Sequence, residues 1–79
     1  MISLTILAPE EMLFDGSVER VKVPGERGEF TILPLHAPII SSLAPGYIKY
    51  YTGEEESKIH IRGGFVEVLK DKVTICIER

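Results

Sequence analysis

Short runs of alternating apolar and polar residues constrain the fold of this chain more than any other feature. Leu4 and Ile6 alternate with polar neighbours near the start, and Val73, Ile75 and Ile77 do the same near the end. Similar runs lie at residues 20–23, 29–32, 58–62 and 66–68. Successive side chains of a strand point to opposite faces, so this period of two predicts half-buried strands. The sequence therefore predicts an all-β fold, a small antiparallel sandwich or barrel of many short strands.

Turn-forming residues separate these runs. Asp15-Gly16 and Pro24-Gly25 are dipeptides typical of tight turns, and Thr52–Glu56 is a polar hairpin loop. Lys70-Asp71 is expected to close the last hairpin. Gly63-Gly64, before a further apolar run, predicts a bulge or a close approach of two backbones.

Size and charge narrow the classes of function. The 79 residues suit one domain, which we expect to span residues 1–79. A net charge of −3 argues against a function in binding nucleic acid and against electrostatic docking on anionic lipid. The single cysteine, Cys76, excludes an internal disulfide and fits a reducing compartment. Without a signal-like N-terminus or a long apolar run, any membrane association is expected to depend on partners.

The segment Val21–Gly46 is where the sequence directs the search for function. It holds four of the five prolines and three of the seven glycines, which predicts a loop-rich surface. His36 within it is a candidate general base or metal ligand. With two histidines and one cysteine in the chain, a zinc site lacks ligands, so a loop anchor or partner contact is favoured. No catalytic, cofactor-binding or metal-binding residue is therefore predicted.

Other motifs offer weaker functional hypotheses. The loop Gly25–Gly28 lacks the ending of a phosphate-binding loop and is expected to aim its charges outward. Tyr47, Tyr50 and Tyr51 are candidates for base stacking in an oligonucleotide-binding barrel, although the acidic charge opposes it. The hairpin Lys70–Lys72 resembles the tip at which lipoyl or biotinyl carrier domains hold their modified lysine. That carrier remains the alternative function.

Several motifs together resemble the epsilon subunit of F-type ATP synthase. They are VPGERGEFTILPLHAP at residues 23–38, LAPG at residues 43–46, GGFVEV at residues 63–68 and VTI at residues 73–75. The opening residues 4–16, which end in Phe14-Asp15-Gly16, are also similar. The likeness covers essentially the whole chain in order. It implies a β-sandwich of about ten short strands in two sheets, as the alternation permits.

The resemblance also implies a function. In that family this domain is a non-catalytic rotor part of the central stalk, linking the gamma subunit to the c-ring for ATP synthesis coupled to proton transport. Catalysis belongs to the beta subunits, and no cofactor is implied. The complex lies at the cytoplasmic face of the bacterial inner membrane. The expected c-ring contacts are Glu26, Arg27, Glu29 and Thr31. The expected gamma contacts are His36, Ser41, Ser42 and Leu43.

One departure from the family concerns regulation. Most bacterial relatives continue into a helical hairpin that inhibits ATP hydrolysis, whereas this sequence stops at Arg79. We therefore expect no such inhibition from these residues. Two readings stay open at this point, a naturally short subunit and a piece of a longer one.

Overall fold

The alternating runs form nine β-strands in a computed structural model that describes all 79 residues. In chain order they are β1 (Ile2–Ala8), β2 (Glu11–Val18), β3 (Arg20–Gly25), β4 (Gly28–Ile32), β5 (Ile39–Leu43), β6 (Gly46–Thr52), β7 (Glu55–Ile61), β8 (Gly63–Leu69) and β9 (Lys72–Glu78). No helix long and apolar enough to cross a membrane is present.

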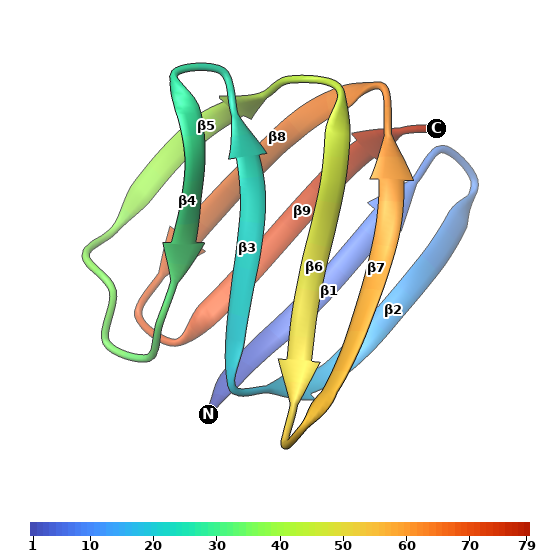
Figure 1. Ribbon diagram of the computed structural model, residues 1–79. Helices are drawn as coiled ribbons and strands as arrows, with labels where there is room; N and C mark the ends of the chain where they lie inside the picture. The colour runs from blue at the N-terminus through green and yellow to red at the C-terminus, as the bar shows by residue number, and fades with distance from the viewer.

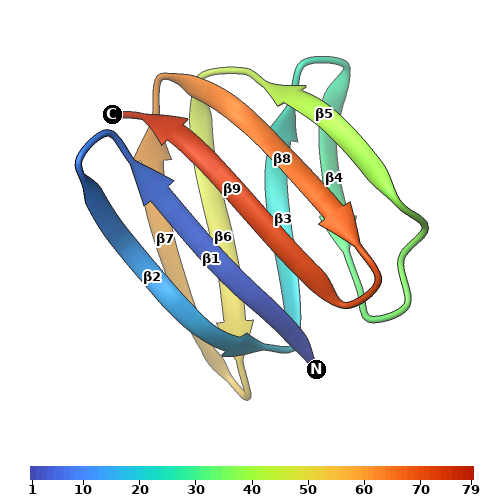
Figure 2. The same ribbon diagram turned by 180° about the vertical axis from the view of Figure 1, so that it is seen from behind.

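The strands are arranged in two layers (Figures 1 and 2). One layer has the order β2-β1-β9-β8-β5, and the other consists of β3, with β4 and β6 on either side, and β7 beyond β6. Hydrogen bonding joins the layers at a single bridge between Gly25 of β3 and Leu43 of β5. The predicted all-β sandwich is confirmed, with nine strands instead of about ten. All neighbouring strands are antiparallel except β1 and β9, which run parallel.

The core lies between the layers and consists of the apolar phase of the alternation. Ile2, Leu4 and Ile6 of β1 are at most 1% exposed. The residues between them face away from the core, with Ser3 exposed and Thr5 half-buried. Val73, Ile75 and Ile77 of β9 repeat the pattern. Fifteen hydrophobic side chains are buried and no polar or charged one is. β-branched side chains dominate this set, as expected for residues that pack on a pleated surface.

Two of the predicted turns are confirmed. Lys70-Asp71 closes the hairpin between β8 and β9, and Gly53-Glu54 forms the tip within the polar segment Thr52–Glu56. The close approach expected at Gly63-Gly64 is also present. A Cβ added to Gly64, whose φ is +147°, would lie 2.1 Å from the carbonyl oxygen of Cys76 on β9. This position therefore needs glycine.

The other two turns were placed wrongly. Asp15-Gly16 lies inside β2, opposite Thr5 and Leu4 of β1, because the apolar alternation of β1 continues past this point and keeps β2 paired. The chain reverses earlier, at Pro9-Glu10, where Glu10 has a φ of 64°. Pro24-Gly25 ends β3, paired with β4, and the reversal takes place at Glu26-Arg27.

Candidate partner-binding surfaces

The turn between β3 and β4 presents charged side chains to solvent. Glu26, Arg27 and Glu29 are all exposed, as the sequence predicted, whereas Thr31 on β4 is half-buried. Gly28, with a φ of 129°, allows the two-residue turn to close. The Glu26 amide donates a hydrogen bond to the Ser42 carbonyl at 3.1 Å, so this turn is fixed against the end of β5.

A groove of about 520 Å³ lies between this turn and β5. Its lining includes Glu26, Arg27 and Glu29 on one side and Ser41 and Ser42 on the other. The structure thus brings together residues that the sequence assigned to two different partners. This grouping could not have been predicted from the sequence, because the two layers meet at the groove through one long-range bridge between β3 and β5.

Leu43 and His36 are placed differently from the two serines. Leu43 is 4% exposed and belongs to the core, so its side chain supports this surface from below instead of forming it. His36 lies on the loop 33–38, at the opposite end of β4 from the Glu26-Arg27 turn (Figure 1). Its Nδ1 is 2.7 Å from the Ala37 carbonyl oxygen, and its amide donates to the Leu33 carbonyl at 3.2 Å. These bonds agree with the interpretation of His36 as a loop anchor.

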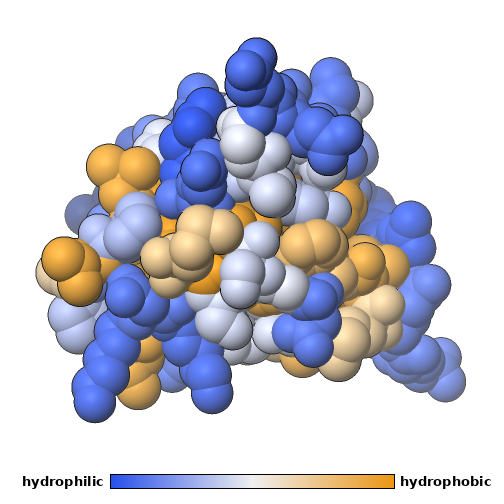
Figure 3. Space-filling view, turned by 90° about the horizontal axis from the view of Figure 1, so that it is seen from below, coloured by the Kyte–Doolittle hydropathy of each residue, from blue (hydrophilic) through white to orange (hydrophobic).

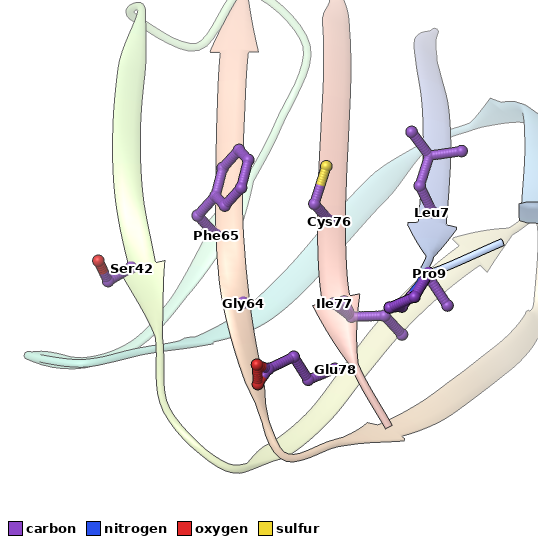
Figure 4. A pocket seen from close by; sticks show the side chains of 9 residues that line it. Leu7, Pro9, Ser42, Gly64, Phe65, Cys76, Ile77 and Glu78 are labelled. Atoms are coloured by element: carbon purple, nitrogen blue, oxygen red, sulfur yellow. The ribbon is translucent and has the colours of Figure 1, made fainter. Parts of the chain in front are cut away.

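The outer face of the first layer carries an apolar hollow of about 490 Å³. Leu7, Phe65 and Cys76 project into it from the neighbouring strands β1, β8 and β9 (Figure 4). Phe65 is 47% exposed, and the Cys76 thiol is free and half-buried. This face is not among the surfaces that the sequence motifs predicted to bind a partner. The signal was available, because Phe65 lies out of phase with the buried Val66 and Val68.

A second apolar region lies where the loop 33–38 meets the turn between β8 and β9. Leu33, Leu35 and Leu69 are 53%, 87% and 56% exposed. Figure 3 views the molecule from this end and shows hydrophobic side chains at the surface between hydrophilic ones. Exposed apolar side chains that lie together in this way are typical of a contact surface.

Most of the titratable groups are exposed at the surface. No three His, Cys, Asp or Glu side chains gather in a way that could hold a metal ion. Glu54 at the hairpin tip and Glu55 and Glu56 at the start of β7 are all exposed. Desolvation by its surroundings, with a hydrogen bond to Glu56, raises the pKa of the Tyr51 phenol above its usual 10.0. The guanidinium of Arg20 lies 3.9 Å from the centre of the Tyr51 ring, which packs this tyrosine in place.

These features define a class of protein, a small two-layered β-sandwich with exposed charged and apolar surfaces suited to binding. Comparison with known families makes the assignment specific. The chain belongs to the family of the ATP synthase delta/epsilon chain β-sandwich domain, which it matches over residues 1–79. The resemblance seen in the sequence motifs is therefore confirmed.

Curated relatives and solved structures agree with this family. The ATP synthase epsilon chain of Maricaulis maris is 44% identical over 73 residues, covering 92% of this chain and 55% of the relative. That of Leptospira borgpetersenii is 38% identical over 77 residues, covering 98% and 61%. The chain thus spans little more than half the length of these relatives.

A chain in the cryo-EM structure of the Euglena gracilis mitochondrial ATP synthase, OSCP/F1/c-ring, superposes with a TM-score of 0.93 at 26% identity. The alignment covers 99% of this chain and 51% of that one. A chain in the Tetrahymena thermophila mitochondrial ATP synthase central stalk/c-ring structure has a TM-score of 0.82 at 19% identity and shares the fold. The alignment covers 99% of this chain and 63% of that one. None of these relatives supports a lipoyl or biotinyl carrier at Lys70–Lys72.

Proposed function

We propose that this chain is the non-catalytic β-sandwich domain of a central-stalk subunit of F-type ATP synthase. In this role it links the gamma subunit to the c-ring and turns with the rotor, while catalysis takes place in other subunits. The observation that carries the proposal is the superposition, at a TM-score of 0.93 and 26% identity, on a chain of an F1/c-ring assembly. We further propose that residues 1–79 form one domain and that it needs no cofactor.

The packing suits a part that transmits torque. Both layers share one core of fifteen buried apolar side chains, with no buried polar group that would need to be satisfied. Cores of this kind are close-packed and resist compression, so the sandwich moves as a rigid body between its partners. We also propose that the complex lies at the cytoplasmic face of a bacterial inner membrane, where this domain is held through its partners; the relatives that support a bacterial source are ATP synthase epsilon chains of bacteria.

The contact residues follow from the resemblance and from their exposure. Glu26, Arg27 and Glu29 offer charges to polar loops of the c-ring, with the half-buried Thr31 beneath them. For the gamma subunit we propose His36, with Ser41 and Ser42 as further contacts and Leu43 as a buried support. Because Ser41 and Ser42 share a groove with Glu26, a partner at this end touches both sets.

Binding to the cognate gamma subunit tests the function. Calorimetry of the purified chain with gamma is expected to give a saturable 1:1 complex. Solvent labelling of His36 is expected to fall in that complex. The absence of heat and of co-purification would remove the proposal.

Crosslinking tests the orientation toward the c-ring. A cysteine introduced by Glu29→Cys is expected to crosslink to the c-ring in the reassembled complex. The matched control is Glu54→Cys, at an exposed hairpin tip on the opposite end of the molecule. The unchanged chain, which keeps Cys76, gives the background. Equal crosslinking from the two positions would contradict the assignment of Glu29.

A further inference from the structure

Leu35 combines two unfavourable features at one position. Its φ is 67°, a left-handed conformation that a bulky side chain rarely adopts. Its side chain is also 87% exposed, so burial does not offset this strain. Glycine or asparagine would occupy this backbone more easily. Strained residues of this kind persist only where the surrounding structure holds them, and they gather at functional sites.

The group that holds Leu35 is the carboxylate of Asp71. The Leu35 amide donates a hydrogen bond to Asp71 Oδ1 at 2.7 Å, across 36 positions of sequence. The Asp71 carbonyl accepts a second bond from the Ser3 amide at 2.8 Å, which ties the turn between β8 and β9 to the start of β1. A hydrogen bond to an ionised acceptor is stronger than a neutral one. Asp71 thus fixes the middle of the loop 33–38 to the end of the first layer at which β8 and β9 are joined.

The surface around Leu35 indicates the chemistry of the partner. Leu69 and Ile40 are 56% and 74% exposed and border a shallow hollow of about 360 Å³ beside the loop. Lys70 and Lys72 flank Asp71, and both are exposed. Neither forms an ion pair, since the molecule contains a single one, between Arg79 and Glu11. A complementary surface is therefore apolar at its centre and carries carboxylates at its rim.

We propose that Leu35 is the anchor through which this chain binds the gamma subunit, and that Asp71 is the positioning residue that holds Leu35 in the binding shape. The assignment of gamma as the occupant rests on the proposed function. The exposed, unpaired Lys70 and Lys72 predict that the gamma surface facing them carries carboxylates. In this arrangement the strain at Leu35 is kept because the side chain reaches its partner only from that conformation.

Substitutions that separate strain from contact test the anchor. Leu35→Gly removes the side chain and relieves the left-handed strain, so this variant is expected to unfold at the same temperature or higher. Its affinity for gamma is expected to fall about tenfold to a hundredfold, the effect of losing one buried leucine. Leu35→Met keeps the apolar contact and is expected to bind within about threefold of the original chain. Met12→Ala is the control, at an apolar side chain 58% exposed on β2.

Asp71 is tested by rescue and by coupling. Asp71→Ala is expected to weaken binding about tenfold, while Asp71→Asn, which keeps an acceptor oxygen, restores most of it. In the Leu35→Gly background, Asp71→Ala is expected to change affinity by less than about twofold, because it acts only through Leu35. In the chain alone, the Leu35 amide is expected to exchange slowly with solvent, and to lose this protection in Asp71→Ala.

The outcomes are distinguishable from failure of the proposed function. If the original chain does not bind gamma at all, the proposed function fails and this inference with it. If the original chain binds but Leu35→Gly binds equally well, only the anchor is overturned. An unprotected Leu35 amide in the original chain, or equal effects of Asp71→Ala with and without Leu35, would overturn the positioning role even where gamma binds.

Discussion

Replacing Gly64 with alanine tests whether the close approach of β8 and β9 is essential to the sandwich. A Cβ at this position would lie 2.1 Å from the Cys76 carbonyl oxygen and 2.9 Å from the Ile77 Cα. Both neighbours are backbone atoms of β9, so no side chain can rotate away. To lengthen the 2.1 Å approach to an ordinary contact of 3.4 Å or more, the strands must separate by at least about 1.3 Å, a form of overpacking.

The expected cost is a large part of the stability of the fold. Overpacking costs about 1–3 kcal/mol, and the φ of +147° at Gly64 adds about 1–3 kcal/mol for a residue with a side chain. We therefore expect Gly64→Ala to lower the free energy of unfolding by about 4 kcal/mol. A chain of 79 residues has about 4–12 kcal/mol in total. The melting temperature should fall by roughly 15–30 °C.

Thermal and urea unfolding, followed by circular dichroism, measure this loss, and two glycines supply matched controls. At Gly63 an added Cβ meets only the Leu43 carbonyl oxygen, at 3.8 Å, so Gly63→Ala is expected to be nearly neutral. At Gly28, with a φ of +129° and nothing within 4 Å, alanine isolates the backbone strain. A Gly64→Ala protein no less stable than Gly28→Ala would refute the argument, since the clash would then cost nothing.

Two further predictions concern the charged surface. The surroundings of Tyr51 favour its neutral phenol in the folded state, which raises its pKa above 10.0. The contribution of this group to the free energy of unfolding is therefore complete below pH 10.0 and is lost as the pH rises through the pKa of the folded state. Absorbance titration should place Tyr51 above 10.0, and Tyr51→Phe should remove this part of the alkaline loss of stability; titration at or below 10.0 would contradict it. The ion pair between Arg79 and Glu11, at 3.2 Å with side chains 58% and 56% exposed, is expected to contribute less than about 1 kcal/mol. Urea unfolding of Arg79→Ala at low and high salt measures it, and a larger, salt-insensitive loss would show the pair to be structural.

The strands could be predicted because the information is local. The phase of Leu4 and Ile6, or of Val73, Ile75 and Ile77, is fixed by which face meets the core, and the structure buries all five. Turns were predicted less well, because a turn dipeptide acts only where the flanking strands stop pairing. Asp15-Gly16 stays in β2 because β1 continues opposite it.

The candidate surfaces depended on contacts that no local pattern encodes. Ser41 and Ser42 meet the Glu26-Arg27 turn because the two layers join at Gly25 and Leu43. The bond between Leu35 and Asp71 spans 36 positions, and neither residue carries a motif for it. Leu43 shows a different limit. It lies on the same, inward face of β5 as the half-buried Ile39 and Ser41, which explains its burial, whereas the resemblance assigned it to a partner.

The parallel pairing of β1 with β9 has a consequence for biosynthesis. β9 (Lys72–Glu78) lies between β1 and β8, so the last of the nine strands to be translated completes the middle of its layer. Until it leaves the ribosome, β1 and β8 each lack one neighbour, and Leu4 and Val66 lack the cover that Val73 and Ile75 provide. Folding of the sandwich must therefore wait until β9 has left the ribosome, and until then the nascent chain carries open strand edges. The uncovered side chains of Leu4 and Val66 and the open edges of β1 and β8 should make the unfinished chain a substrate for ribosome-associated chaperones.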